Sequence, residues 1–193
     1  LYINNKKDMS IKGDVLFTKY GFSGFGILDI SQKASYYLLL KQDIKISINF
    51  FPDLSKDLLI NSISNILKSL PNENVSIVLG GIISNKLSPI LLEVCNLDNN
   101  IKSSNLNSKH IRNIVNQLLN WKVKVIDTQG FKHAEVSGGG ISTNEVNNKT
   151  MESKFIKGLF FSGEILDITG QRGGYNLHFA WASGYLASKF LSK

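Results

Sequence analysis

The sequence predicts a mixed α+β fold with α/β character, in which strands, a helical block and a terminal strand–turn–helix unit follow one another. Three observations support this. Apolar residues alternate with polar ones at 43–51, they recur at helical spacing through 53–120, and a glycine-rich turn precedes a long apolar stretch at 177–190. Hydrophobic residues make up 42% of the 193 positions, which is enough to form the core of one domain or two small ones.

The first 52 residues are typical of strands around one short helix. Residues 12–18 form a strand candidate, and Ser23 is expected to cap a helix over 24–34. Residues 43–51 alternate Ile44, Ile46, Ile48 and Phe50 with polar residues, the pattern of a half-buried strand, and Pro52 ends it.

Residues 53–120 change to helical periodicity, which predicts a small helical subdomain between strands. Pro71 is expected to stop the first helix, and Ser108 to cap the last one. The predicted helices are 58–70, 73–79, 88–94 and 109–120.

Strand patterns return after the helical block. Residues 121–126 alternate apolar and polar side chains, as a strand does. Residues 131–137 form a second, shorter strand candidate, and 159–161 have the composition of a buried strand. The glycine pair Gly173-Gly174 then predicts a turn that starts the C-terminal helix.

Composition and charge limit the classes of protein and of partner. The net charge is +7, and lysines are spread through loops, so both a solvated surface and a polyanion partner such as RNA stay open. Cys95, the one cysteine, lies in an apolar helical pattern that favours a buried thiol. The three histidines are scattered, which argues against a metal site.

The same composition predicts a cytoplasmic protein. No run approaches the roughly 18 apolar residues of a spanning helix, so we expect no membrane contact. The polar first residues do not have the pattern of a signal peptide, and a single cysteine fits a reducing compartment.

The terminal block carries the clearest chemical signal. Glu164 and Asp167 follow a predicted strand, at the end where open α/β sheets place ligand-contacting side chains. A helix that begins after Gly174 has unpaired leading amides and the positive end of its dipole, which suit an electron-rich ligand. Alone, Glu164 and Asp167 are equally typical of ordinary turn and cap residues, and Gly173-Gly174 more often marks a turn than a ligand site.

Three blocks together resemble a flavoprotein family, the HI0933-like or aminoacetone oxidase-like family, which has bile-acid reductase relatives. The blocks are Gly13-Asp-Val-Leu-Phe-Thr18 with the turn at 20–24, Ala134-Glu-Val-Ser-Gly-Gly-Gly140, and Gly158 to Tyr185. The third is the most specific, because Gly-Glu-x-x-Asp followed by Gly-Gly-Tyr-Asn and a helix restricts more than a lone glycine motif.

The resemblance implies a larger protein with an N-terminal FAD-binding domain, an inserted domain and a C-terminal return to the FAD domain. Residues 1–131 then correspond to a β-barrel-like insert with its helical subdomain at about 53–120, and 132–193 to the C-terminal segment of the FAD/NAD(P)-binding domain. No GxGxxG unit for the ADP half of FAD occurs in this sequence, so we expect the fragment alone to be inactive and free of FAD.

The resemblance and the helix argument together predict a set of cofactor-binding residues, with no metal ligand and no assigned catalytic residue. Backbone donors at a helix start would stabilise negative charge on a reduced flavin, and glycines would admit close approach. The predicted residues are Gly139, Gly163, Glu164, Asp167, Gly173, Gly174, Tyr175 and Asn176.

The expected function is therefore part of a FAD-dependent oxidoreductase. It would transfer hydride between flavin and a small unsaturated or carbonyl-bearing substrate, or a base in RNA. The expected partner is the N-terminal FAD-binding region, and apolar residues from Phe160 to Phe190 predict self-association if uncovered. The alternative is a non-enzymatic module that docks protein or nucleic acid through residues 53–120.

Overall fold

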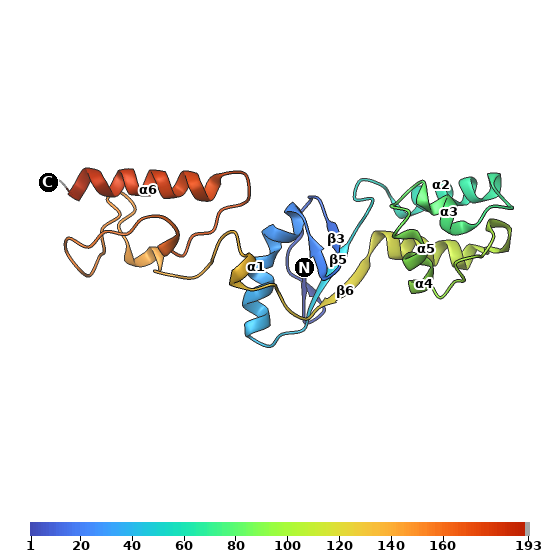
Figure 1. Ribbon diagram of the computed structural model, residues 1–193, viewed down its shortest axis with the longest axis horizontal. Helices are drawn as coiled ribbons and strands as arrows, with labels where there is room; N and C mark the ends of the chain where they lie inside the picture. Colours follow the sequence, from blue (N-terminus) through green and yellow to red (C-terminus); the bar gives the residue numbers. More distant parts are fainter. Residues whose placement is uncertain (192–193) are drawn as a thin grey trace. The chain divides into compact units, whose positions relative to one another are not determined.

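The computed structural model describes residues 1–191, in which short strands alternate with helices (Figure 1). The strands are β1 (Tyr2–Ile3), β2 (Lys6–Lys7), β3 (Leu16–Thr18), β4 (Gly21–Ser23), β5 (Ile44–Ile48) and β6 (Trp121–Val125). The α-helices are α1 (Phe25–Leu39), α2 (Lys56–Ser69), α3 (Val75–Gly80), α4 (Ser88–Val94), α5 (Ser108–Leu119) and α6 (Tyr175–Leu191). Single 3₁₀ turns are η1 (Ser103–Asn105), η2 (Phe131–His133), η3 (Thr143–Glu145) and η4 (Gly163–Ile165). The predicted mixed fold class is confirmed.

The strands form two small sheets. One sheet has the order β2-β1-β5-β6, and the other is the antiparallel hairpin of β3 and β4, in which Leu16 pairs with Ser23. Along β5 the isoleucines Ile44, Ile46 and Ile48 are buried, and the residues between them are half-buried. The period-two pattern at 43–51 therefore predicted this strand correctly.

The chain forms two compact units. The first unit contains residue 1, residues 3–44 and the chain from Val125 onward, and the second contains residues 2 and 45–124. The second unit holds α2 to α5, and the first holds α1 and α6.

The core of the second unit comes from the inward faces of four helices. Helix α2 contacts α5, and α3 contacts α4. Leu59, Ile63 and Leu67 lie one turn apart on α2 and are buried, while Leu58 is 58% exposed. The other buried apolar residues on these helices are Val75, Val78, Leu79, Leu91, Leu92, Ile114, Val115 and Leu118.

Both helix caps predicted on serine were wrong. Asn107, with extended backbone, accepts hydrogen bonds from the amides of Lys109 and His110, so it caps α5 and Ser108 is the first helical residue. Helix α1 follows Gly24, which provides no side-chain cap, and Ser23 ends β4. In both places the neighbouring residue satisfies the geometry of the helix start.

Three predicted strands differ from the structure. Residues 12–18 form a strand only at Leu16–Thr18, and 131–137 contain the turn η2 instead. Residues 159–161 have a single antiparallel bridge between Phe160 and Glu152, and Leu159 is exposed. These segments have strand-like composition, but they lack the neighbouring strand with which a ladder forms.

Helix α6 packs a small core against the segment before it. Val146, Met151, Leu166 and Ala187 are buried together, and Phe160, Phe161 and Phe179 pack against them. The opposite side of α6 exposes Leu177, Trp181 and Tyr185, which line a shallow apolar hollow of about 480 Å³. The structure thus covers part of the apolar surface that the sequence left open, and self-association stays a prediction.

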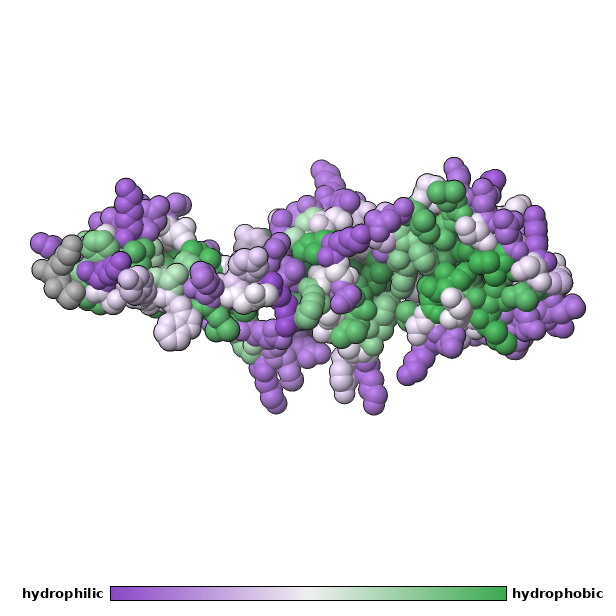
Figure 2. Space-filling model, turned by 90° about the horizontal axis from the view of Figure 1, so that it is seen from above, coloured by the Kyte–Doolittle hydropathy of each residue, from purple (hydrophilic) through white to green (hydrophobic). Residues whose placement is uncertain are grey.

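Apolar side chains also reach the surface of the second unit. Leu58, Ile66 and Ile77 are exposed on α2 and α3. Figure 2 shows hydrophobic surface in the helical part of the chain. Across residues 1–191, none of the helices has the length and apolar character that crossing a membrane requires. The same residues contain no cluster of three or more His, Cys, Asp or Glu side chains arranged for a metal ion.

Candidate cofactor site

Helix α6 begins at Tyr175, directly after the glycine pair, as the sequence predicted. Gly173 and Gly174 have φ values of 115° and 90°, which disfavour residues with a side chain. The first helical hydrogen bond runs from the His178 amide to the Gly174 carbonyl, at 2.9 Å. Within residues 1–191 the amides of Tyr175, Asn176 and Leu177 have no hydrogen-bond acceptor from the chain. The leading end of α6 is therefore available to an outside acceptor.

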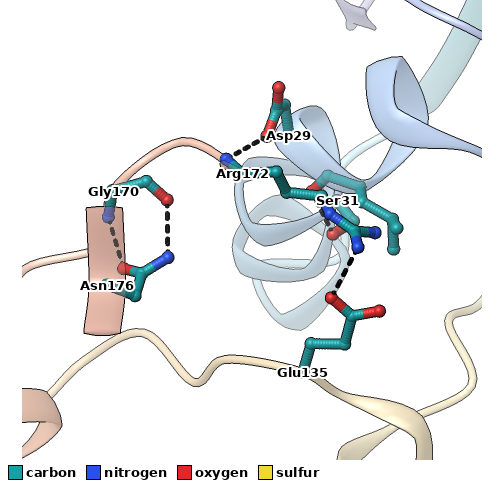
Figure 3. Close-up of polar contacts among 7 residues, drawn as sticks. Asp29, Ser31, Glu135, Gly170, Arg172 and Asn176 are labelled. Carbon is teal, nitrogen blue, oxygen red and sulfur yellow. Dashed lines mark hydrogen bonds and ion pairs between the residues drawn. The ribbon is translucent and has the colours of Figure 1, made fainter. Parts of the chain in front are cut away.

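The Asn176 side chain turns back from the helix end (Figure 3). Its Oδ1 accepts from the Gly170 amide at 2.7 Å, and its Nδ2 donates to the Gly170 carbonyl at 3.0 Å. This pair closes the loop 170–176 on itself. Asn176 was predicted to contact the cofactor, and here it fixes the loop that exposes the helix start. The Tyr175 side chain is largely exposed beside it.

Glu164 and Asp167 both hold the glycine-rich turn that precedes them by some 30 residues. Glu164 Oε1 accepts from the amide of Ser137 at 2.5 Å and from its hydroxyl at 3.0 Å. Asp167 Oδ1 accepts from the Gly139 amide at 3.0 Å. Three predicted site residues, Gly139, Glu164 and Asp167, are thus brought together, although their separation in sequence gave no indication of these pairs.

Backbone hydrogen bonds support the same junction. Ile141 donates to the Ile165 carbonyl, and the Asp167 amide donates to the Ile141 carbonyl, both at 2.9 Å. A Cβ built on Gly140 would lie 2.4 Å from the Ile165 carbonyl oxygen, so this position requires glycine. The turn 137–140 and the segment 164–167 therefore form one tightly joined structure.

The two Ser137 hydrogen bonds lower the pKa of Glu164, the backbone bond more than the hydroxyl bond. Because the folded-state pKa is depressed, this contact stabilises the junction above the ordinary glutamate pKa of about 4.3 and is lost as pH falls through the lower folded value. We expect the Ser137 amide chemical shift to titrate with a midpoint below about 4.3. Glu164→Gln keeps the acceptor and should abolish the titration, whereas a midpoint at or above 4.3 would contradict the contact.

Gly163 lies beneath α6 and not at its open end. Its φ is 70°, and its amide donates to the buried Ser183 hydroxyl at 2.9 Å. The Ser183 hydroxyl in turn donates to the Phe179 carbonyl at 2.7 Å. Gly163, which was predicted to admit the cofactor, here joins η4 to the middle of α6.

Arg172 is a part of the site that sequence reasoning did not assign. Its guanidinium lies 3.0 Å from Glu135, and its amide donates to Asp29 at 3.2 Å (Figure 3). The guanidinium also lies 4.6 Å from the centre of the Phe25 ring. The loop before α6 is thereby anchored to α1, with a second bond from Gln32 to Thr169 at 3.0 Å. The sequence feature that could have pointed to Arg172 is its position next to the glycine pair. Its partners are more than 30 residues away in the sequence, so the contacts themselves could not be predicted.

The residues present fit a cofactor with an electron-rich edge. Both glycine segments, the pair 173–174 and the turn 138–140, leave open space at one position. A Cβ added to Gly174 or to Gly139 would meet no atom within 4 Å. Unpaired amides at 175–177 supply donors, and the Asp167 carboxylate supplies an acceptor for hydroxyl groups. These features suit the reduced pyrimidine edge of a flavin and its hydroxylated chain.

Comparison with known proteins shows which sequences this chain resembles. A family described as HI0933-like protein barrel and H2TH domain matches residues 1–136. A 3-dehydro-bile acid delta(4,6)-reductase from Clostridium scindens is 33% identical over 92% of this chain and 43% of its own length. Ribosomal RNA dihydrouridine synthases from Escherichia coli and Haemophilus influenzae are 32% and 30% identical over 92% and 95% of this chain. The chain spans about two-fifths of the length of these relatives.

Proposed function

The chain belongs to the HI0933-like family, and we propose that it forms part of a FAD-dependent oxidoreductase that transfers hydride to an unsaturated substrate. The rest of the FAD site would come from the longer protein, because these residues lack the glycine motif for the ADP half. The relatives named above act as reductases or make dihydrouridine, and both are reductions of unsaturated bonds.

The open start of α6 is the observation that carries this proposal. Bound FAD would supply hydride chemistry, and the chain's residues would supply binding and charge stabilisation. The amides of Tyr175, Asn176 and Leu177 would donate to the edge that gains negative charge, and the positive end of the helix dipole would add to this. Asp167 and Glu164 would keep the turn at 137–139 in place.

Two substrate classes are supported by the relatives. A bile-acid reductase points to an unsaturated ring ketone, and the dihydrouridine synthases point to a uracil base in ribosomal RNA. Both contain a C=C bond conjugated to a carbonyl, so the same stabilised hydride donor serves either.

A single-turnover experiment on the full-length protein, in which reduced flavin is mixed with substrate and its reoxidation is followed, tests the proposed function. We expect the purified protein to show a flavin absorbance spectrum, and the anaerobically reduced flavin to be reoxidised by one of two substrates. These are an unsaturated 3-oxo steroid and unmodified ribosomal RNA, with saturated steroid and dihydrouridine-containing RNA as matched controls. Full-length protein without flavin, or flavin that none of these compounds reoxidises, would contradict the proposal.

A further inference from the structure

A second hollow lies in the helical unit. Its lining residues fall between 95 and 116, so none of them is a predicted cofactor-binding residue. It has a volume of about 590 Å³ and is lined by the C-terminal end of α4 and one side of α5. The lining includes Lys109, Arg112, Asn113 and Asn116 from α5 and Cys95 and Asn96 from the α4 end. None of the lining residues is acidic. The hollow is thus a polar, cationic groove.

The four α5 residues form one line along the helix. Their spacing of three, one and three residues places them on a single face in successive turns. The seven residue steps from Lys109 to Asn116 extend over roughly 10 Å, at 1.5 Å per residue. A single phosphate is too small to contact all four, whereas consecutive phosphates of a nucleic-acid strand extend over this length.

The groove is uncharged on its α4 side. Burial raises the pKa of the Cys95 thiol to about 11, so at neutral pH it brings no negative charge. Asn113 Nδ2 donates to the Cys95 carbonyl at 3.3 Å, which ties α5 to the end of α4. Within residues 1–191 no carboxylate is paired with Lys109 or Arg112. The two cations and the amide groups are therefore available to an anionic partner.

We propose that this groove binds the phosphate backbone of RNA. A line of Lys, Arg and Asn donors is the pattern that contacts phosphates, while docked proteins require an apolar centre, which this line of α5 residues does not provide. Residues 45–124 contain nine Lys or Arg and five Asp or Glu, a net +4 (9 − 5) that attracts a polyanion. The choice of RNA rests on the proposed function, but the phosphate contact does not.

Salt-dependent binding of a labelled RNA hairpin to the full-length protein tests the groove. The Lys109→Gln/Arg112→Gln double variant should weaken binding by roughly tenfold and reduce the slope of log K against log salt by about 2. The control is Lys56→Gln/Lys68→Gln, which removes the same charge from exposed positions on α2. It should change both quantities much less. Asn116→Asp, which places a carboxylate on the line, should weaken binding as well.

Three outcomes would overturn the proposal. The groove and control variants could lose equal RNA affinity, or the affinity of the wild-type protein could stay unchanged with salt. The third is displacement of RNA by poly-glutamate at equal charge concentration. The last would indicate an acidic protein partner. Flavin absorbance measured on the same samples separates this proposal from the proposed function, because loss of RNA binding with unchanged flavin concerns the groove alone.

Discussion

Replacing Leu59 by alanine should destabilise the helical unit by about 2–5 kcal/mol, the usual cost of truncating a fully buried leucine. Leu59 is 3% exposed and lies in line with Ile63 and Leu67 on the face of α2. Helix α2 contacts α5, where Ile114 and Leu118 are also buried, so the shortened side chain would leave a cavity.

The neighbouring leucine provides the matched control. Leu58→Ala makes the same chemical change on the same helix, but Leu58 is 58% exposed, so its effect should stay within about 0.5 kcal/mol. Urea unfolding followed by circular dichroism measures both variants. Equal losses at the two positions would mean that α2 does not present this face to the core.

Replacing Asp167 by alanine in the full-length protein should weaken FAD binding by roughly ten- to a hundred-fold. The Gly139 amide would lose its acceptor, and a hydrogen bond to a charged group contributes about 1.5–3 kcal/mol, where 1.4 kcal/mol is tenfold. The turn at 137–140 would then be held by Glu164 and the Ile141 backbone pairs.

Asp167→Asn separates this positioning effect from a loss of charge. Asparagine keeps an oxygen that accepts from Gly139, so FAD retention should stay close to that of the wild-type protein. The ratio of flavin absorbance to protein absorbance after gel filtration gives the result. If alanine and asparagine behave alike, the hydrogen bond to Gly139 does not hold the cofactor site.

Local sequence signals predicted the regular elements well. The glycine pair and the apolar run after it located α6, and the alternation at 43–51 located β5. Helical spacing located α2 and α4, with Pro71 marking the end of α2. In each case the information lies within about ten residues of the element. The confirmed elements are therefore those that local periodicity and backbone chemistry determine.

Contacts between distant segments could not be predicted in the same way. The pairs Glu164–Ser137, Asp167–Gly139 and Arg172–Asp29 join residues 27, 28 and 143 positions apart. Within the predicted helix 58–70, packing against α5 likewise decides that Leu59 is buried and Leu58 is exposed. Such choices depend on tertiary packing, which a single sequence does not reveal.

The exposed amides at the start of α6 are the central claim, and hydrogen exchange of the full-length protein tests it most directly. The amides of Tyr175, Asn176 and Leu177 should exchange rapidly in flavin-free protein and become protected when FAD is added, because the cofactor would accept their hydrogens. Unchanged exchange at these three positions, in protein whose absorbance shows bound FAD, would contradict the claim.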